Sequence, residues 1–282
     1  MKYQQVQAIG GKGTGPDRFH TALRGIAVDK RNNLYAVGDT DLKVFNATSG
    51  GFARGWATAH PGHAVAVAGD GSIYVGEEGQ LEIFDPQGRL INNWRDPEKM
   101  GRITAIGFAK GSVLLGDAND RCIRRYDATG KFLNNIGMEG FLIPNGVVEF
   151  SVDACGGLHV TNPGKHRVER YTLWDELLGH IGRFDGIDPA GFPGCCNPTN
   201  IAVTGCDRVY VTEKAGPRVK VYDFNGKLLA VIAGEEAFDP NCKNMDIAVD
   251  ARGRAYVVDT VKLEIRAFAP VEESVLPVWP NQ

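Results

Sequence analysis

The sequence predicts an all-β protein, a six-bladed β-propeller of four-stranded antiparallel blades that is closed by its N-terminal strand. Three observations predict this fold: short runs of alternating apolar residues, turn residues between the runs, and six copies of a unit of four runs. The clearest copy is residues 200–234, whose runs are 201–203, 209–212, 219–222 and 228–232. Each run has the length and the β-branched content of a strand and is bounded by Gly, Pro, Asn or Asp.

The first strand of each copy sets the period of the repeat. The six motifs begin at Gly25, Ala64, Ala105, Gly146, Asn200 and Asp246, at intervals of 39, 41, 41, 54 and 46 residues. A period near 40 with four strands per unit is typical of propeller blades. Third strands end on an aromatic residue in every copy, and we expect these rings to pack between blades: Phe45, Phe84, Tyr126, Tyr171, Tyr222 and Phe268.

The fourth strands indicate how the ring closes. Five copies have one, at 52–56, 89–94, 131–136, 176–181 and 227–232, but the sixth copy stops at Pro270. Residues 3–9 resemble the missing strand, so we expect them to complete the last blade and to remove its exposed edge. The predicted domains are a propeller over residues 1–270 and a C-terminal tail over residues 271–282, which carries two prolines and no repeat pattern.

Composition excludes several classes of protein. Hydrophobic residues make up 43% and charged residues 23% of the 282 residues, as in a globular protein with a core. The net charge of −3 gives no basic excess, so we expect no nucleic-acid partner. No apolar run approaches the roughly 18 residues that cross a bilayer, so we expect no membrane span. The opening residues, Met1 to Gln5, are too polar for a signal peptide.

The repeat unit resembles an NHL repeat. The resemblance rests on the motif Gly25-Ile-Ala-Val-Asp29, on second strands that end in an acid, and on the strand Arg218-Val-Lys-Val-Tyr-Asp223 with the Gly-Lys turn after it. It covers residues 3 to about 270 and implies a six-bladed propeller. The segment Gly194-Cys-Cys-Asn-Pro-Thr-Asn200 is similar to one in bacterial NHL proteins. The family includes sensor domains, RNA-binding modules, protein-interaction platforms and an amidating lyase, so the resemblance leaves the activity open.

The residues just before each first strand are expected to line the mouth of the central channel. They are Arg24, His63, Thr104, Asn145, Thr199 and Met245, with Asn200 and Asp246 beside them. This polar mouth of mixed charge is a candidate site for a small ligand. The simpler interpretation is that a channel mouth is polar because water fills it.

The sequence favours a non-catalytic module that binds a ligand or a protein partner through loops on a rigid frame. The insertion at 183–198 lengthens one repeat and offers apolar side chains of the kind that anchor partners, namely Phe184, Ile187, Phe192 and Pro193. On this interpretation we expect no cofactor, and the partner is a protein or a small molecule.

The alternative is a metal-dependent hydrolase, a lactonase-like enzyme or a lyase. Leu142-Ile-Pro-Asn-Gly146 resembles the Pro-Asn-Gly by which gluconolactonase-type lactonases place an Asn on calcium. A divalent metal such as Ca or Zn would then bind among Asn145, Asn200, Asp246 and His63. The amidating lyase would repeat a channel His on several blades, but only His63 occupies that position here.

The six cysteines align by position in the repeat. Cys155 and Cys206 share one position in neighbouring blades, and Cys196 and Cys242 share another. We expect the disulfide Cys155–Cys206, and a second one between Cys242 and either Cys195 or Cys196. Metal binding by the last three, redox activity of the vicinal pair and buried free thiols stay open as alternatives. Disulfides would indicate an oxidising, extracytoplasmic location, either periplasmic or secreted.

Overall fold

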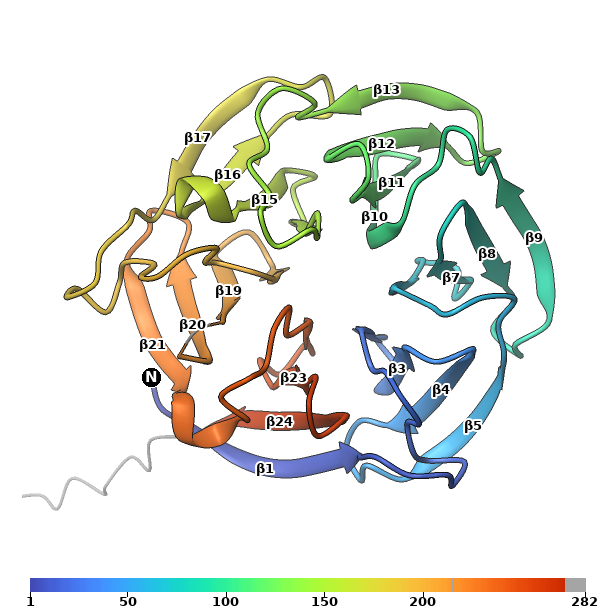
Figure 1. The fold of residues 1–282 in the computed structure, drawn as a ribbon, viewed down its shortest axis with the longest axis horizontal. Helices are drawn as coiled ribbons and strands as arrows, with labels where there is room; N and C mark the ends of the chain where they lie inside the picture. The colour runs from blue at the N-terminus through green and yellow to red at the C-terminus, as the bar shows by residue number, and fades with distance from the viewer. Residues whose placement is uncertain (215, 272–282) are drawn as a thin grey trace, which may run out of the picture.

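The computed structural model describes residues 1–214 and 216–271 and shows a ring of six sheets around a central axis (Figure 1). Each sheet has four strands, and every pair of neighbouring strands within a sheet is antiparallel. The predicted fold class is therefore confirmed. Except for Val271, the predicted tail lies outside the described residues.

The first three blades follow the chain from the axis outward. Blade one contains β2 (Gly25–Val28), β3 (Asn33–Val37), β4 (Asp41–Asn46) and β5 (Phe52–Ala57). Blade two contains β6 (Ala64–Val67), β7 (Ile73–Gly76), β8 (Gln80–Phe84) and β9 (Leu90–Arg95). Blade three contains β10 (Ile103–Ala109), β11 (Ser112–Asp117), β12 (Cys122–Asp127) and β13 (Phe132–Ile136).

The other three blades continue around the ring, and two short 3-10 helices, η1 (Pro163–Lys165) and η2 (Glu235–Ala237), lie in their loops. Blade four contains β14 (Phe150–Val152), β15 (Leu158–Asn162), β16 (Arg167–Tyr171) and β17 (Leu177–Ile181). Blade five contains β18 (Ile201–Thr204), β19 (Arg208–Glu213), β20 (Arg218–Asp223) and β21 (Leu228–Ala233). Blade six contains β22 (Ile247–Val249), β23 (Ala255–Asp259), β24 (Glu264–Pro270) and, as its outer strand, β1 (Tyr3–Gly10).

The N-terminal strand closes the ring as the sequence predicts. β1 pairs with β24 in an antiparallel register that runs from Tyr3 opposite Pro270 to Gly10 opposite Glu264. Figure 1 shows β1 running alongside β24 at the outer edge of this blade. Because the first and last parts of the chain share one sheet, the ring cannot open without breaking backbone hydrogen bonds.

Aromatic pairs fill the space between neighbouring blades. All six third-strand aromatics are buried, at most 8% exposed, and each has an aromatic partner. Trp56 of blade one lies 5.7 Å from Phe84 of blade two, and Trp94 lies 5.8 Å from Tyr126 in the next interface. Loop residues supply the partner in other interfaces, as in Phe238 against Phe268 at 5.8 Å. Rings suit these positions because they bury a large apolar area at the contact of two sheets.

The predicted first strand of blade four is wrong by several residues. The sequence motif was placed at residues 146–149, whereas β14 begins at Phe150. The motif that matches the other blades is Glu149-Phe-Ser-Val-Asp153, which ends in Asp like Gly25-Ile-Ala-Val-Asp29. The interval to the second strand identifies it, because Leu158 follows Glu149 by nine positions, as Leu34 follows Gly25.

The disulfide Cys155–Cys206 is present and links blades four and five. Its Cα atoms are 6.2 Å apart, within the range that a disulfide spans. The predicted second disulfide does not form, since Cys195, Cys196 and Cys242 are all free thiols. Cys242 instead donates its S–H to Asp259 Oδ1 at 3.1 Å. That expectation failed because a shared position in the repeat does not bring two side chains within bonding distance.

Removing this disulfide is expected to lower the stability of the propeller. With a sequence separation of 51 between the two cysteines, the loop-entropy model predicts a loss of about 4 kcal/mol for Cys155→Ser combined with Cys206→Ser. Denaturant unfolding measures this loss, and Cys195→Ser, an exposed thiol, is the control. Thiol titration of denatured, unreduced parent protein should count four free thiols, and a count of six would contradict the assignment.

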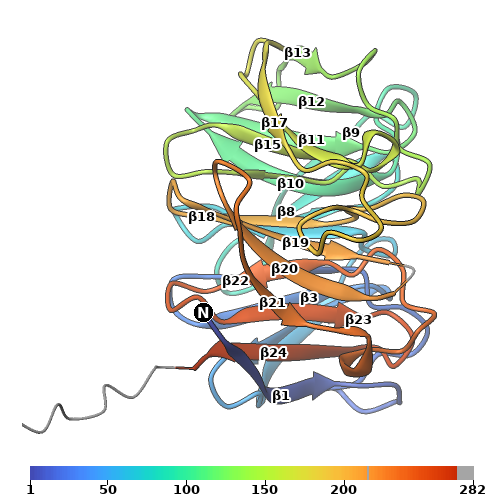
Figure 2. The ribbon, with the colours of Figure 1, turned by 90° about the vertical axis from the view of Figure 1, so that its left-hand side faces the viewer.

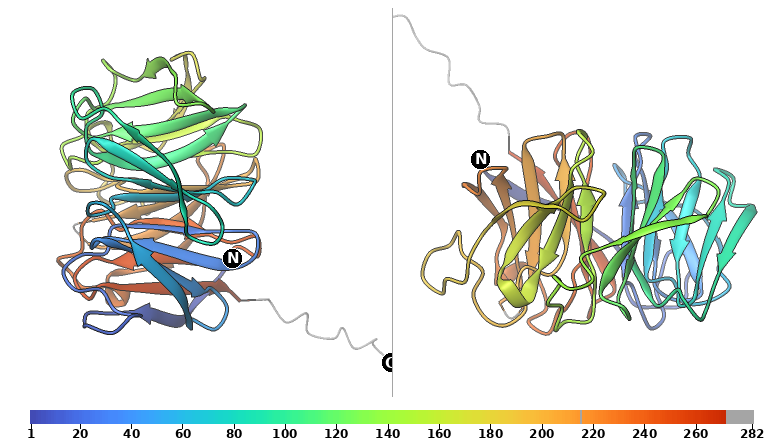
Figure 3. Two further views of the ribbon diagram at one scale, coloured as in Figure 1. Left: turned by 90° about the vertical axis from the view of Figure 1, so that its right-hand side faces the viewer. Right: turned by 90° about the horizontal axis from the view of Figure 1, so that it is seen from above.

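The right-hand view of Figure 3 shows the loop between β17 and β18 projecting beyond the blades, and in Figure 2 this side of the ring faces the viewer. This loop contains the insertion predicted at residues 183–198. Among the described residues, no helix has the length and apolar character to cross a membrane.

Candidate functional site

A pocket of about 510 Å³ opens where the loops before the first strands meet at the axis. All six blades contribute residues to its walls, so residues far apart in sequence share one cavity. The polar side chains that line it are Thr21, Arg24, His63, Arg102, Thr104, Asn145, Glu149, Asn200, Lys243, Asn244 and Thr260. Its volume lies within the range of sites that hold a small molecule.

Two half-buried arginines at this pocket lack an acidic partner. Arg24 Nη1 donates to the carbonyl of Gly38, and Arg102 Nη2 donates to the carbonyl of Gly146 at 2.7 Å. Among residues 1–214 and 216–271, no carboxylate oxygen lies within 4.0 Å of either guanidinium. Burial lowers the pKa of Arg24, the charge of the more distant Asp39 offsets part of this effect, and the charge of Arg102 lowers the pKa further. Because no carboxylate is in contact with either guanidinium, the two arginines make the pocket attractive to an anion.

His63 lies in the same pocket and is neutral at physiological pH. Burial lowers its pKa to about 4, and the positive charges of Arg24 and Arg102 act in the same direction. A neutral imidazole has one donor and one acceptor nitrogen. His63 can therefore orient a ligand by hydrogen bonding without adding a charge to the site.

The floor of the pocket is built by the residues that directly precede the first strands of three consecutive blades. These residues are Glu149, Asn200 and Asp246, whereas the same position holds only Gly or Ala in the other three blades. Asp246 Oδ2 accepts a hydrogen bond of 2.7 Å from the amide of Ile26, which lies across the interface with blade one. Below the floor the channel continues as a second cavity of about 390 Å³, lined by Glu149, Asp246 and the six first strands.

The electrostatics of the floor differ from those of the arginines above it. Burial raises the pKa of Glu149 well above its usual value, and the nearby charge of Asp246 adds to this effect. Burial also raises the pKa of Asp246 to about 7, although hydrogen bonds from Ile26, Ile247 and Asn200 offset part of the shift. The side chain of Asn200 thus interacts with both carboxyl groups, while its own Oδ1 is buried without a hydrogen-bond partner.

The structure places the sequence-predicted mouth residues in three different environments. Arg24, His63, Asn145 and Asn200 line the pocket, and Asp246 lies at its floor, facing the lower channel. Thr199 does not reach the pocket, because it is fully buried and its hydroxyl lies 2.9 Å from that of Thr212. Neighbouring residues of a strand point to opposite faces, so Asn200 faces the axis while Thr199 faces the blade.

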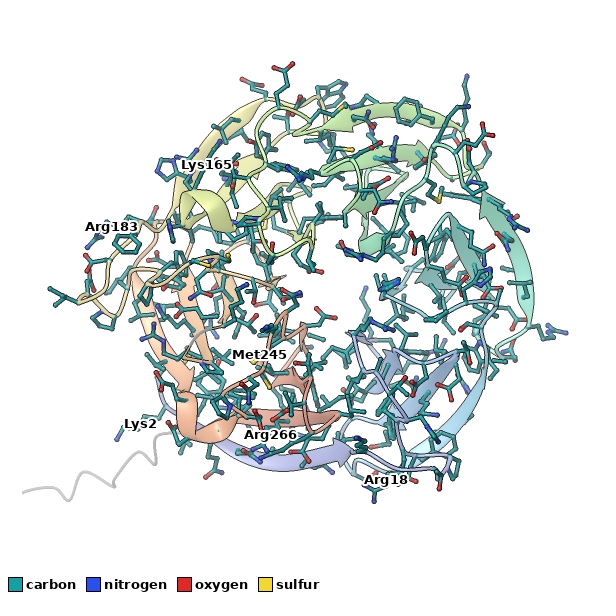
Figure 4. All side chains as sticks on the ribbon, in the orientation of Figure 1. Lys2, Arg18, Lys165, Arg183, Met245 and Arg266 are labelled. Carbon is teal, nitrogen blue, oxygen red and sulfur yellow. A yellow bond between two sulfur atoms is a disulfide. The ribbon has the colours of Figure 1, made fainter. Side chains whose placement is uncertain are left out.

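Met245 does not line the channel mouth, and Asn145 lines it from a different position than the sequence predicts. Met245, labelled in Figure 4, is fully buried in the apolar core that contains Phe238 and Cys242. Asn145 lies above the floor, where its Nδ2 donates to Asn244 Oδ1 of blade six at 3.3 Å. The Pro-Asn-Gly segment therefore does not bring Asn145 to the first position of a strand.

Several pocket residues were not predicted from the sequence, and the two that matter most for its charge are Glu149 and Arg102. Glu149 was missed because the first strand of blade four was placed too early, and the nine-residue interval to the second strand is the signal that identifies it. Arg102 precedes the long strand β10 (Ile103–Ala109), whose motif was read from Ala105. No sequence signal distinguishes Arg102 from other loop arginines.

The predicted partner loop has two exposed residues and one core residue. Phe184 is 63% and Ile187 96% exposed, on the loop that projects beside the labelled Arg183 in Figure 4. Phe192 is fully buried and packs 5.7 Å from Tyr222, so the expectation that it contacts a partner is wrong. It fills an interface between blades, and its position nine residues before Ile201 matches that of Phe238 before Ile247. Pro193 is half-buried beside it.

The vicinal cysteines lie at the end of this loop. Their sulfur atoms are 2.9 Å apart, with Cys195 exposed and Cys196 buried. Burial raises the pKa of the Cys196 thiol, and contact with Cys195 adds to the effect. Cys242 does not contact the vicinal cysteines, because its thiol donates a hydrogen bond to Asp259 instead. Burial raises the pKa of this thiol as well.

Comparison with known proteins supports the fold. No protein-family model and no curated protein matches the chain. A protein of unknown function from Bacteroides thetaiotaomicron VPI-5482 matches with a TM-score of 0.71 and 15% identity, over 95% of this chain and 75% of that one. A streptogramin B lyase matches with a TM-score of 0.59 and 12% identity, over 94% and 96%. At these identities the likeness supports the six-bladed β-propeller fold and shows no shared activity.

Proposed function

We propose that the chain is a binding module for a small anionic molecule, one that carries a carboxylate or a phosphate group. The observation that supports this most is the pair Arg24 and Arg102, which line the pocket without a carboxylate within 4.0 Å among the described residues. Guanidinium groups form strong, charge-assisted hydrogen bonds with carboxylates and phosphates. Exposed Lys243 adds a third cation at the edge of the pocket.

The other walls fit a ligand that has polar groups besides its anionic group. Neutral His63 and the amides of Asn145 and Asn244 offer donors and acceptors within the same cavity. The unpaired Oδ1 of Asn145 can accept one hydrogen bond from a ligand. A metabolite-sized molecule with one acidic group and several hydroxyl or amide groups therefore matches the lining.

Binding of simple anions tests this function. In isothermal titration calorimetry with inorganic phosphate and with citrate, the parent should bind at least one of them, and Arg102→Gln should weaken this binding at least about tenfold. Arg31→Gln, an exposed arginine away from the pocket, makes the same charge change and should leave affinity unchanged. If neither anion binds the parent, or if both variants lose affinity equally, the pocket is not an anion site.

A lyase or hydrolase that uses the same pocket is the second candidate function. It is favoured by Asp246, because a carboxyl group with a pKa of about 7 can act as an acid or a base near neutral pH. The streptogramin B lyase of similar fold shows that such a propeller can carry an enzyme. Anions that bind should be incubated with the protein and analysed for products. Turnover that Asp246→Asn abolishes would establish the enzyme, and unchanged ligands would exclude it for those anions.

We also propose that the chain is an NHL-type propeller and that it works outside the cytoplasm. The repeat motifs described above favour an NHL-type propeller. The disulfide Cys155–Cys206 favours an oxidising, extracytoplasmic compartment. Exposed Ile187 and Phe184 support the further proposal that the projecting loop contacts a protein partner.

A further inference from the structure

Three oxygen-bearing side chains meet at the floor of the pocket with their charge uncompensated. Glu149 and Asn200 are 5% and 2% exposed and line the upper pocket, while Glu149 and Asp246 line the cavity below it. Within residues 1–214 and 216–271, no Lys or Arg nitrogen lies within 4.0 Å of either carboxylate. A buried carboxylate, Glu149, beside a half-buried one, Asp246, is costly without a counter-charge, because the interior solvates charge poorly.

Asn200 supplies a second, independent observation. Its Oδ1 is buried and has no hydrogen-bond partner. The side chain lines the pocket between the two carboxyl groups, on the blade between theirs. A buried amide oxygen without a donor is rare, and it is accounted for when an ion or a water molecule completes the site.

We propose that Glu149, Asn200 and Asp246 bind a hard divalent cation, with Ca²⁺ as the preferred ion. Carboxylate and amide oxygens are the ligands that Ca²⁺ takes, and two carboxylates can supply two oxygens each. The cavities above and below the floor leave room for water molecules to complete the coordination. The cation balances the charge of the two carboxylates and joins blades four, five and six at the axis.

The same residues disfavour zinc. Zinc sites are built from thiolate and imidazole ligands in tetrahedral geometry, and this floor has neither. His63 lies on the opposite side of the ring, in blade two, and the free thiols belong to the projecting loop, to β12 and to the loop before β22. The inference is independent of the anion site, because Arg24 and Arg102 take no part in it.

Calorimetric titration of chelator-treated protein with Ca²⁺, Mg²⁺ and Zn²⁺ tests the proposal. The parent should bind one Ca²⁺ per chain and melt at a higher temperature with Ca²⁺ than with chelator. Glu149→Gln should weaken Ca²⁺ binding at least about a hundredfold and abolish the thermal shift. Glu78→Gln makes the same substitution at an exposed position of blade two, on the same face of the ring but away from the site, and should behave as the parent.

The melting temperature in chelator shows whether the variant folds. Glu149→Gln removes a buried charge and keeps the shape of the side chain, so it should melt at or above the temperature of the metal-free parent. Asn200→Ala, which removes only the amide ligand, should weaken Ca²⁺ binding at least about tenfold. The proposal fails if the parent binds neither Ca²⁺ nor Mg²⁺, if Glu149→Gln binds Ca²⁺ like the parent, or if Zn²⁺ binds more tightly than Ca²⁺.

Discussion

Deletion of residues 1–10 is expected to leave the protein unable to form a stable monomeric propeller. β1 is the outer strand of blade six, so the deletion exposes the edge of β24 along its whole length. It also removes Ile9, which is 2% exposed and packs in a core cluster with Phe19 and Leu263. An open strand edge beside an exposed core is a template for aggregation. The loss is comparable with the whole stability of a typical domain, about 5–15 kcal/mol.

Size-exclusion chromatography and thermal melting by circular dichroism measure this effect. The deleted protein should elute as aggregate or fail to melt cooperatively. A monomer with a cooperative transition like that of the parent would show that closure by β1 does not hold the ring together.

A single substitution in β1 tests the contribution of its side-chain packing while the strand itself stays in place. Ile9→Ala should cost about 2–5 kcal/mol, because it removes a fully enclosed side chain. Val6→Ala is the control, since Val6 lies on the same strand but is 43% exposed, and it should change stability by less than about 0.5 kcal/mol.

Glu213→Ala is expected to destabilise the protein by about 3–5 kcal/mol, because it leaves a lysine buried without its counter-charge. Lys220 Nζ lies 2.5 Å from Glu213 Oε1, and both side chains are fully buried. Burial lowers the pKa of Lys220, and the charge of Glu213 offsets part of that effect. The two groups form an ion pair but not a well-aligned hydrogen bond. The pair therefore stabilises the fold through the attraction of the two charges.

Lys220 also attaches the projecting loop to blade five. Its Nζ donates to the carbonyl of Gly191 at 2.6 Å and lies 5.2 Å from the ring of Phe192. Glu213→Ala should therefore increase proteolysis within residues 183–198 as well as lower global stability. Denaturant unfolding and limited proteolysis measure the two effects separately.

Replacing both Glu213 and Lys220 tests whether the loss comes from the unpaired buried charge. Glu213→Leu combined with Lys220→Met should recover most of the loss, because no buried charge remains unpaired and Arg218 can turn toward solvent. Glu176→Ala, an exposed acid in blade four, should have little effect. If Glu213→Ala behaves like Glu176→Ala, the buried pair does not contribute to stability.

The sequence predicted the strands and the ring closely, and it predicted the site only in part. Strand positions follow from local alternation, so β1 and the five other outer strands were found within one residue or two. The disulfide Cys155–Cys206 followed from equivalent positions in adjacent blades. The same reasoning failed for Cys242, because an equivalent position fixes a place in the blade and not the distance between two sulfur atoms.

The amino-acid sequence by itself determined the number of blades, the order of their strands, the closing role of β1 and one disulfide. These features depend on residue period and turn chemistry, which are properties of neighbouring residues. Only the tertiary structure decided that Glu149 meets Asn200 and Asp246 at the axis, that Arg102 joins Arg24, and that Phe192 enters the core. The first strands converge at the axis from distant parts of the chain, and a shift of one residue turns a side chain from the channel to a blade interface.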